Sequence, residues 1–171
     1  YIYNKTKPDG LTVGVWNNIF VVHEALGSRR VQFKARKFGW VGAPITGFPS
    51  CAVMGFTGLK TWEDVLKSGK PLKMGSAGGT GTTLPTILNT VTGKKVFDII
   101  PGYRGTGPVR LAMQARELGG VCMAFESMRV TARAMLDAKG DDKLIPILVY
   151  GDPPDPELQN RPRVRDLVKG K

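Results

Sequence analysis

The sequence has one histidine and two cysteines among 171 residues, and this scarcity excludes several kinds of site. His23 alone cannot supply a zinc ligand set, and Cys51 and Cys122 form no C-x-x-C motif. Without a G-x-S-x-G motif, hydrolysis by a histidine-assisted nucleophile has little support. We therefore expect no metal and no other cofactor. Both cysteines lie in apolar, strand-like segments, where buried free thiols are the default expectation and a disulfide between neighbouring strands is the alternative.

Long apolar runs are also missing, because none approaches the ~20 residues that cross a bilayer. The chain is therefore not expected to be embedded in a membrane. Lys and Arg outnumber Asp and Glu by 25 to 14, a net charge of +11. No nucleic-acid-binding motif accompanies this charge, so a solvated basic surface that attracts anions is favoured over a nucleic-acid partner. The chain begins at Tyr1 and not at methionine, and we expect it to be a piece of a longer protein.

The central feature is the glycine-rich stretch Gly75–Thr83, which lies between a short apolar segment and a helical pattern. Leu84, Ile87, Leu88 and Val91 have the spacing of one apolar helix face. A strand, a glycine turn and a helix bring free N–H groups towards an anion. No lysine follows Gly81 as in a P-loop, and the spacing does not match a dinucleotide fingerprint. The two remaining interpretations are a purely structural turn and, preferred here, an oxygen-anion site.

The same strand–turn–helix order recurs along the chain. Residues 96–100 predict a strand, residues 101–108 a glycine-rich turn, and Leu111, Ala115 and Leu118 one helix face. Pro108 suits the first helical turn. Further strands are predicted at 11–16, 38–45, 50–56, 121–125 and 144–150, where 38–45 and 50–56 are either two strands or one bent strand. Further helices are predicted at 19–26, 61–69 and 128–138, and Thr61 and Asp64 have the spacing of a capping box at the start of the second of these. This alternation predicts an α/β fold with a mostly parallel sheet flanked by helices.

Parallel strands bring their carboxyl ends to one edge of a sheet, where ligands collect in α/β folds. Each helix N-terminus there contributes roughly 0.3–1 kcal/mol to a nearby anion, so hydroxyl, amide and guanidinium groups must add to it. Glu126 is the odd member, since an acid repels a carboxylate ligand; a helix N-terminal acid is an equally good interpretation. The candidate ligand-binding residues are Asn17, Asn18, Ser76, Gly78, Gly79, Thr80, Gly81, Thr82, Tyr103, Arg104, Gly105, Thr106, Gly107, Glu126 and Ser127.

Five short motifs, in order, resemble the solute receptors of tripartite tricarboxylate transporters, the Bug family of periplasmic binding proteins. They are Lys7-Pro8-Asp9-Gly10-Leu11-Thr12, Lys60-Thr61-Trp62-Glu63-Asp64-Val65, Lys73-Met74-Gly75-Ser76-Ala77-Gly78, residues 101–108 and Phe125-Glu126-Ser127. The likeness extends over nearly the whole chain. Arg104 stands where that family has lysine, and Glu126 where it has aspartate. A planar guanidinium can clasp a carboxylate with two hydrogen bonds, which lysine cannot.

The resemblance implies a fold like the type II periplasmic binding proteins, with two α/β domains joined by crossing strands. Residues 1–45 would be part of the first domain, 46–143 the nearly complete second ligand-binding domain, and 144–171 a return segment into the first. The implied function is a non-catalytic periplasmic receptor that captures a di- or tricarboxylate, or a related acid, for membrane transporter subunits. An α/β enzyme acting on a phosphorylated or carboxylated substrate in the same anion site is the alternative.

Overall fold

The computed structural model describes residues 2–16, 19–25, 27–29, 31–43 and 47–168, which divide into two units. Unit 1 spans Tyr1–Ile45 and unit 2 spans Thr46–Lys171. The strand β5 (Leu144–Val149) and the described residues after it pack in unit 2. The return of residues 144–171 into a first domain stays a prediction about a longer chain.

Unit 1 contains the helices α1 (Ile2–Lys5) and α2 (Ile19–Ala25) and a 3-10 turn at Ala35–Lys37. The strand predicted at 11–16 is wrong, and so is the strand at 38–43, the described part of the predicted 38–45. The alternating side chains of Leu11, Val13 and Val15 are 75–87% exposed, because no other strand pairs with this segment in the described part of the chain. An apolar alternation specifies a strand only when a partner covers it.

Unit 2 is built on a five-stranded sheet with the order β3-β2-β4-β1-β5. β2, β3 and β4 run parallel to one another, and β1 runs antiparallel to both of its neighbours. The predicted mostly parallel α/β sheet is therefore confirmed, with one reversed strand near its centre. The strands are β1 (Pro49–Met54), β2 (Leu72–Gly75), β3 (Phe97–Ile100), β4 (Gly120–Ala124) and β5 (Leu144–Val149).

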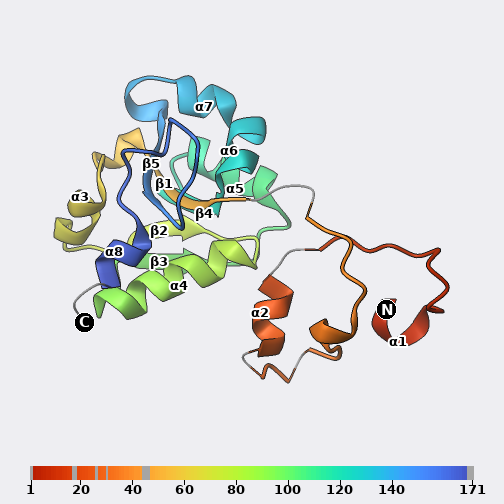
Figure 1. Cartoon of the computed structure of the whole chain (residues 1–171). Coiled ribbons are helices and arrows are strands. Elements are labelled where there is room, and N and C mark those ends of the chain that lie inside the picture. The colour runs from red at the N-terminus through yellow and green to blue at the C-terminus, as the bar shows by residue number, and fades with distance from the viewer. Residues whose placement is uncertain (1, 17–18, 26, 30, 44–46, 169–171) are drawn as a thin grey trace. The chain divides into compact units, whose positions relative to one another are not determined.

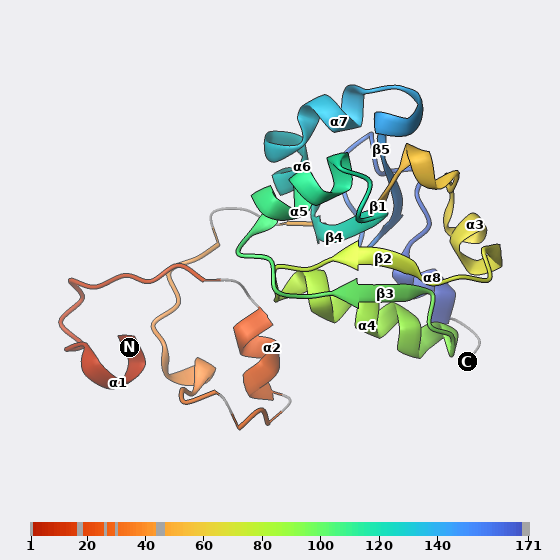
Figure 2. The same cartoon turned by 180° about the vertical axis from the view of Figure 1, so that it is seen from behind.

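Helices cover both faces of this sheet, α5, α6 and α7 on one side and α4 on the other (Figures 1 and 2). Alternate residues of β1 explain the two layers, since Ala52 and Met54 enter one apolar core while Cys51 and Val53 enter the other. The helices are α3 (Trp62–Lys67), α4 (Thr80–Thr92), α5 (Thr106–Gln114), α6 (Phe125–Thr131), α7 (Arg133–Asp137) and α8 (Val164–Val168), with 3-10 turns at Gly55–Thr57 and Gly140–Asp142.

Several helix boundaries differ from the sequence-based expectation. Helix α5 ends at Gln114, so Leu118 lies beyond it, and Leu111 is exposed while Val109, Ala112 and Met113 are buried. The helix predicted over residues 128–138 starts earlier, at Phe125, and is interrupted at Ala132. By contrast, the capping box of Thr61 and Asp64 at the start of α3 is confirmed, because its signal is entirely local.

Cys51 and Cys122 are joined by a disulfide, so the expectation of buried free thiols is wrong. The two residues are paired directly across the antiparallel strands β1 and β4. Both cysteines are buried, at 0% and 1% exposure. The bond therefore links two adjacent strands in the middle of the sheet.

Candidate functional site

The three parallel strands end at the same edge of the sheet, as predicted. Gly75 pairs with Ile100, and the amide of Ser76 donates to the carbonyl of Ile100 at 2.9 Å. The turns at residues 76–79 and 101–105 therefore start side by side. β2 leads through α4 to β3 on one side, and β4 leads through α6 and α7 towards β5 on the other. Such a reversal of winding between adjacent strands is where ligands bind in open α/β sheets.

The first turn is held by its own hydroxyl groups. Ser76 is buried, and its Oγ lies 2.6 Å from Thr82 Oγ1 and accepts the amide of Gly78 at 3.0 Å. Gly79 caps the start of α4 with φ +53° and ψ −127°, a backbone conformation that residues other than glycine rarely adopt. The two hydroxyls that were predicted to meet a ligand thus hydrogen-bond each other, and the surface that this turn exposes is residues 77–79.

The start of α4 offers fewer free amides than the sequence suggested. The amide of Gly81 donates to Gly78, and the amides of Thr82 and Thr83 both donate to Gly79, at 2.9–3.2 Å. The helix begins tightly on the carbonyls of its own turn, so three N–H groups expected to be free are used. Gly81 is buried, and a Cβ there would stand 3.4 Å from the carbonyl oxygen of Cys122. Its position serves the packing of α4 on β4.

The second turn is more open. Gly105 precedes α5 with φ +125°, which favours glycine, and no side chain of the described residues caps the start of this helix. In the described ranges no acceptor binds the amides of Thr106 and Gly107, and no ion pair or hydrogen bond occupies the exposed guanidinium of Arg104. Tyr103 is half-buried against the core. Among the described residues, the start of α5 therefore has two amides without an acceptor and one exposed cation without a partner.

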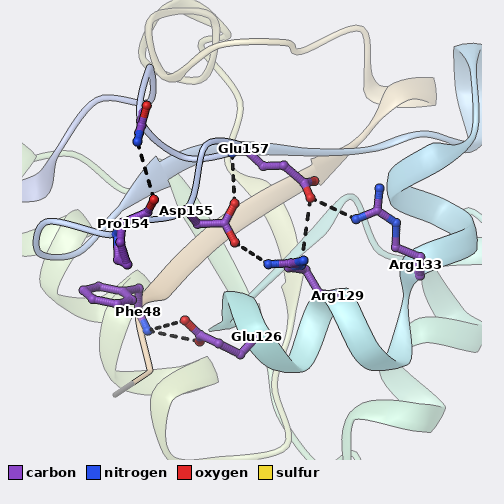
Figure 3. Close-up of polar contacts among 8 residues, drawn as sticks. Phe48, Glu126, Arg129, Arg133, Pro154, Asp155 and Glu157 are labelled. Carbon is purple, nitrogen blue, oxygen red and sulfur yellow. Dashed lines mark hydrogen bonds and ion pairs between the residues drawn. The ribbon is translucent and has the colours of Figure 1, made fainter. Parts of the chain in front are cut away.

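Glu126 lies in the first turn of α6, as one of its two interpretations expected, and its carboxylate contacts the chain itself. Both of its carboxylate oxygens accept the backbone amide of Phe48, at 3.2 and 3.1 Å (Figure 3). Ser127 is exposed one residue further along α6, where its carbonyl accepts the hydroxyl of Thr131. The other two candidates, Asn17 and Asn18, lie outside the described residues.

A hollow of about 490 Å³ lies on α6 and α7, lined by Glu126, Arg129, Val130 and Arg133. Its cations are already neutralised, because Arg129 binds Asp155 at 2.6 Å and Arg133 binds Glu157 at 2.9 Å (Figure 3). Hydrogen bonds from Arg133 to Asp137 and Glu157 raise the pKa of its guanidinium.

This ion-pair network was not predicted from the sequence. Its acidic residues lie in the proline-rich segment after β5, more than 20 residues from the arginines, and no local pattern connects them. The spacing of Arg133 and Asp137, four residues apart on a predicted helix, indicates the ion pair between these two residues only.

No protein-family model matches the chain, and no curated protein does. In the described part of the chain, no three His, Cys, Asp or Glu side chains are grouped so that they could hold a metal ion. None of the described helices combines the length and apolar character that a membrane span needs.

Proposed function

We propose that the chain is the larger part of a solute-binding receptor that captures an organic carboxylate at the edge of the sheet formed by the turns 76–79 and 101–105. One observation carries this proposal. Arg104 is exposed and has no partner, and the amides of Thr106 and Gly107 have no acceptor in the described ranges, next to a second open glycine turn at the reversal of winding between strands. A guanidinium and two amide donors are the groups that recognise a carboxylate.

The type II periplasmic-binding-like architecture, with two domains joined by crossing strands, belongs to the same proposal. Its support is the division of the chain at residues 45 and 46 and the reversed strand β1 that follows. A buried disulfide is typical of oxidising compartments, which favours the periplasm as the location. In that setting the ligand would be a di- or tricarboxylate or a related acid, passed on to membrane transporter subunits.

The proposal is tested by measuring the binding of succinate and citrate by calorimetry with two arginine variants. Arg104→Ala should weaken binding about tenfold or more, since a hydrogen bond to a charged group contributes about 1.5–3 kcal/mol. Arg110→Ala is the matched control, because Arg110 lies further along α5 and also has no ion-pair partner in the described ranges. It removes the same charge and should change the affinity by less than about twofold. Equal effects of the two variants would remove Arg104 from the site.

The same samples distinguish a receptor from an enzyme. We expect saturable heat with the acid recovered unchanged after incubation, as judged by mass spectrometry. Consumption of the acid would instead favour an α/β enzyme that uses the same anion site.

A further inference from the structure

Both backbone groups of Phe48 are held where β4 meets α6. The amide of Phe48 donates to the carboxylate of Glu126, and its carbonyl accepts the amide of Phe125 at 3.0 Å. β1 begins at the next residue, Pro49, which pairs with Ala124. The side chain of Glu126, from α6, thus fixes Phe48 at the residue before β1 starts (Figure 3).

The junction of β4 and α6 places Glu126 next to Phe48. Glu126 lies in the first turn of α6, which follows β4 without a connecting loop. A Cβ at Gly47 would stand 3.5 Å from Glu126 Oε2, so the carboxylate lies close against the incoming chain. The ring of Phe48 packs against the apolar core that contains Phe125. The carboxylate therefore satisfies an amide that the β1–β4 ladder leaves unpaired.

We infer that Glu126 is a positioning residue that fixes the start of β1 against the β4–α6 junction, and that it does not contact the carboxylate ligand. The inference rests on the proposed function for the site that Glu126 borders. An acid in direct contact with an anionic ligand would repel it unless the ligand carried an ammonium group. Because both oxygens are directed at the Phe48 amide, we expect Glu126 not to select amino acids over plain organic acids.

Two measurements on the whole chain test this, with Glu126→Gln, Glu126→Ala and the control Glu117→Ala. Glu117 is exposed, and no ion pair engages it in the described part of the chain. The first measurement is hydrogen exchange of the Phe48 amide by NMR without ligand. Glu126→Ala should speed the exchange about tenfold or more, because a hydrogen bond to a charged group is lost. Glu126→Gln keeps an acceptor oxygen and should retain most of the protection. An unchanged rate in Glu126→Ala would overturn the contact.

The second measurement is the affinity for succinate and for aspartate. Glu126→Gln should leave the ratio of the two affinities within about twofold, whereas an acid that binds the ammonium of aspartate would give a selective loss of aspartate binding of about tenfold or more. A selective loss, or a gain in succinate binding, would overturn the inference. If the unaltered protein binds neither acid, the proposed function fails, and the exchange rates still decide the role of Glu126. If Glu126→Ala does not fold, Glu126→Asp, which withdraws the carboxylate by one methylene, replaces it in the exchange experiment.

Discussion

Removing the disulfide between Cys51 and Cys122 should lower the stability of unit 2 substantially. The bond closes a loop with a sequence separation of 71 residues. For a loop of that length, the loss of freedom that a cross-link imposes on the unfolded chain corresponds to about 4 kcal/mol. In a protein of this size, 1 kcal/mol shifts the melting temperature by about 2–4 °C, so we expect a decrease of roughly 8–16 °C.

The assay is thermal unfolding followed by circular dichroism for Cys51→Ala, Cys122→Ala and the double variant. Each single variant already abolishes the cross-link, so the double variant should cost little more than either one, apart from the packing lost at the second site. Because both cysteines are buried, dithiothreitol should reduce the native protein slowly and the unfolded protein quickly. Two free thiols in the freshly unfolded, unreduced protein would refute the reasoning at its first step.

Two further predictions concern single side chains. The side chain of Asn89 donates a hydrogen bond to the carbonyl of Phe97 and accepts one from its amide, both at 2.9 Å, on the outer side of the edge strand β3. Asn89→Ala should therefore lower the free energy of unfolding, measured in urea, by about 2–3 kcal/mol. An unchanged midpoint of unfolding would contradict this. Hydrogen bonds from the amide of Lys60 and from Thr61 lower the pKa of Asp64 in the folded protein. The ionised carboxylate therefore stabilises the folded state fully above the ordinary carboxyl pKa of about 4, and this stabilisation is lost as the pH falls through the lowered pKa of the folded state. Asp64→Asn should accordingly melt below the unaltered protein at pH 7, with the difference shrinking towards pH 2; a difference independent of pH would exclude the carboxylate as its source.

The features predicted correctly from the sequence are those with local causes. The capping box at Thr61 depends on four consecutive residues, and each glycine turn follows a short apolar strand directly. Parallel strands then place the two turns at one edge without any further information. This was enough to bring residues 76–82 and 101–107 together.

The features that were missed depend on contacts distant in sequence. No local sequence pattern predicts that β1 runs antiparallel to its neighbours. The pairing of Cys51 with Cys122 follows only once the register of β1 against β4 is known. The contact from Glu126 to Phe48 spans 78 residues and has the same origin. Ser76 and Thr82 were predicted to bind a ligand, whereas their hydroxyls hydrogen-bond each other. A hydroxyl in a turn has the same sequence signature in both cases.

The place of β1 in the sheet also constrains how the chain acquires its structure during synthesis. Its two neighbours in the sheet, β4 and β5, begin only at Gly120 and Leu144. A ribosome-bound chain that stops before residue 120 therefore carries an apolar segment with no strand to pair with and a cysteine with no partner. Such long-range pairing is slow and exposes the segment to association with other chains. The centre of the sheet is completed only when nearly the whole of unit 2 has been made.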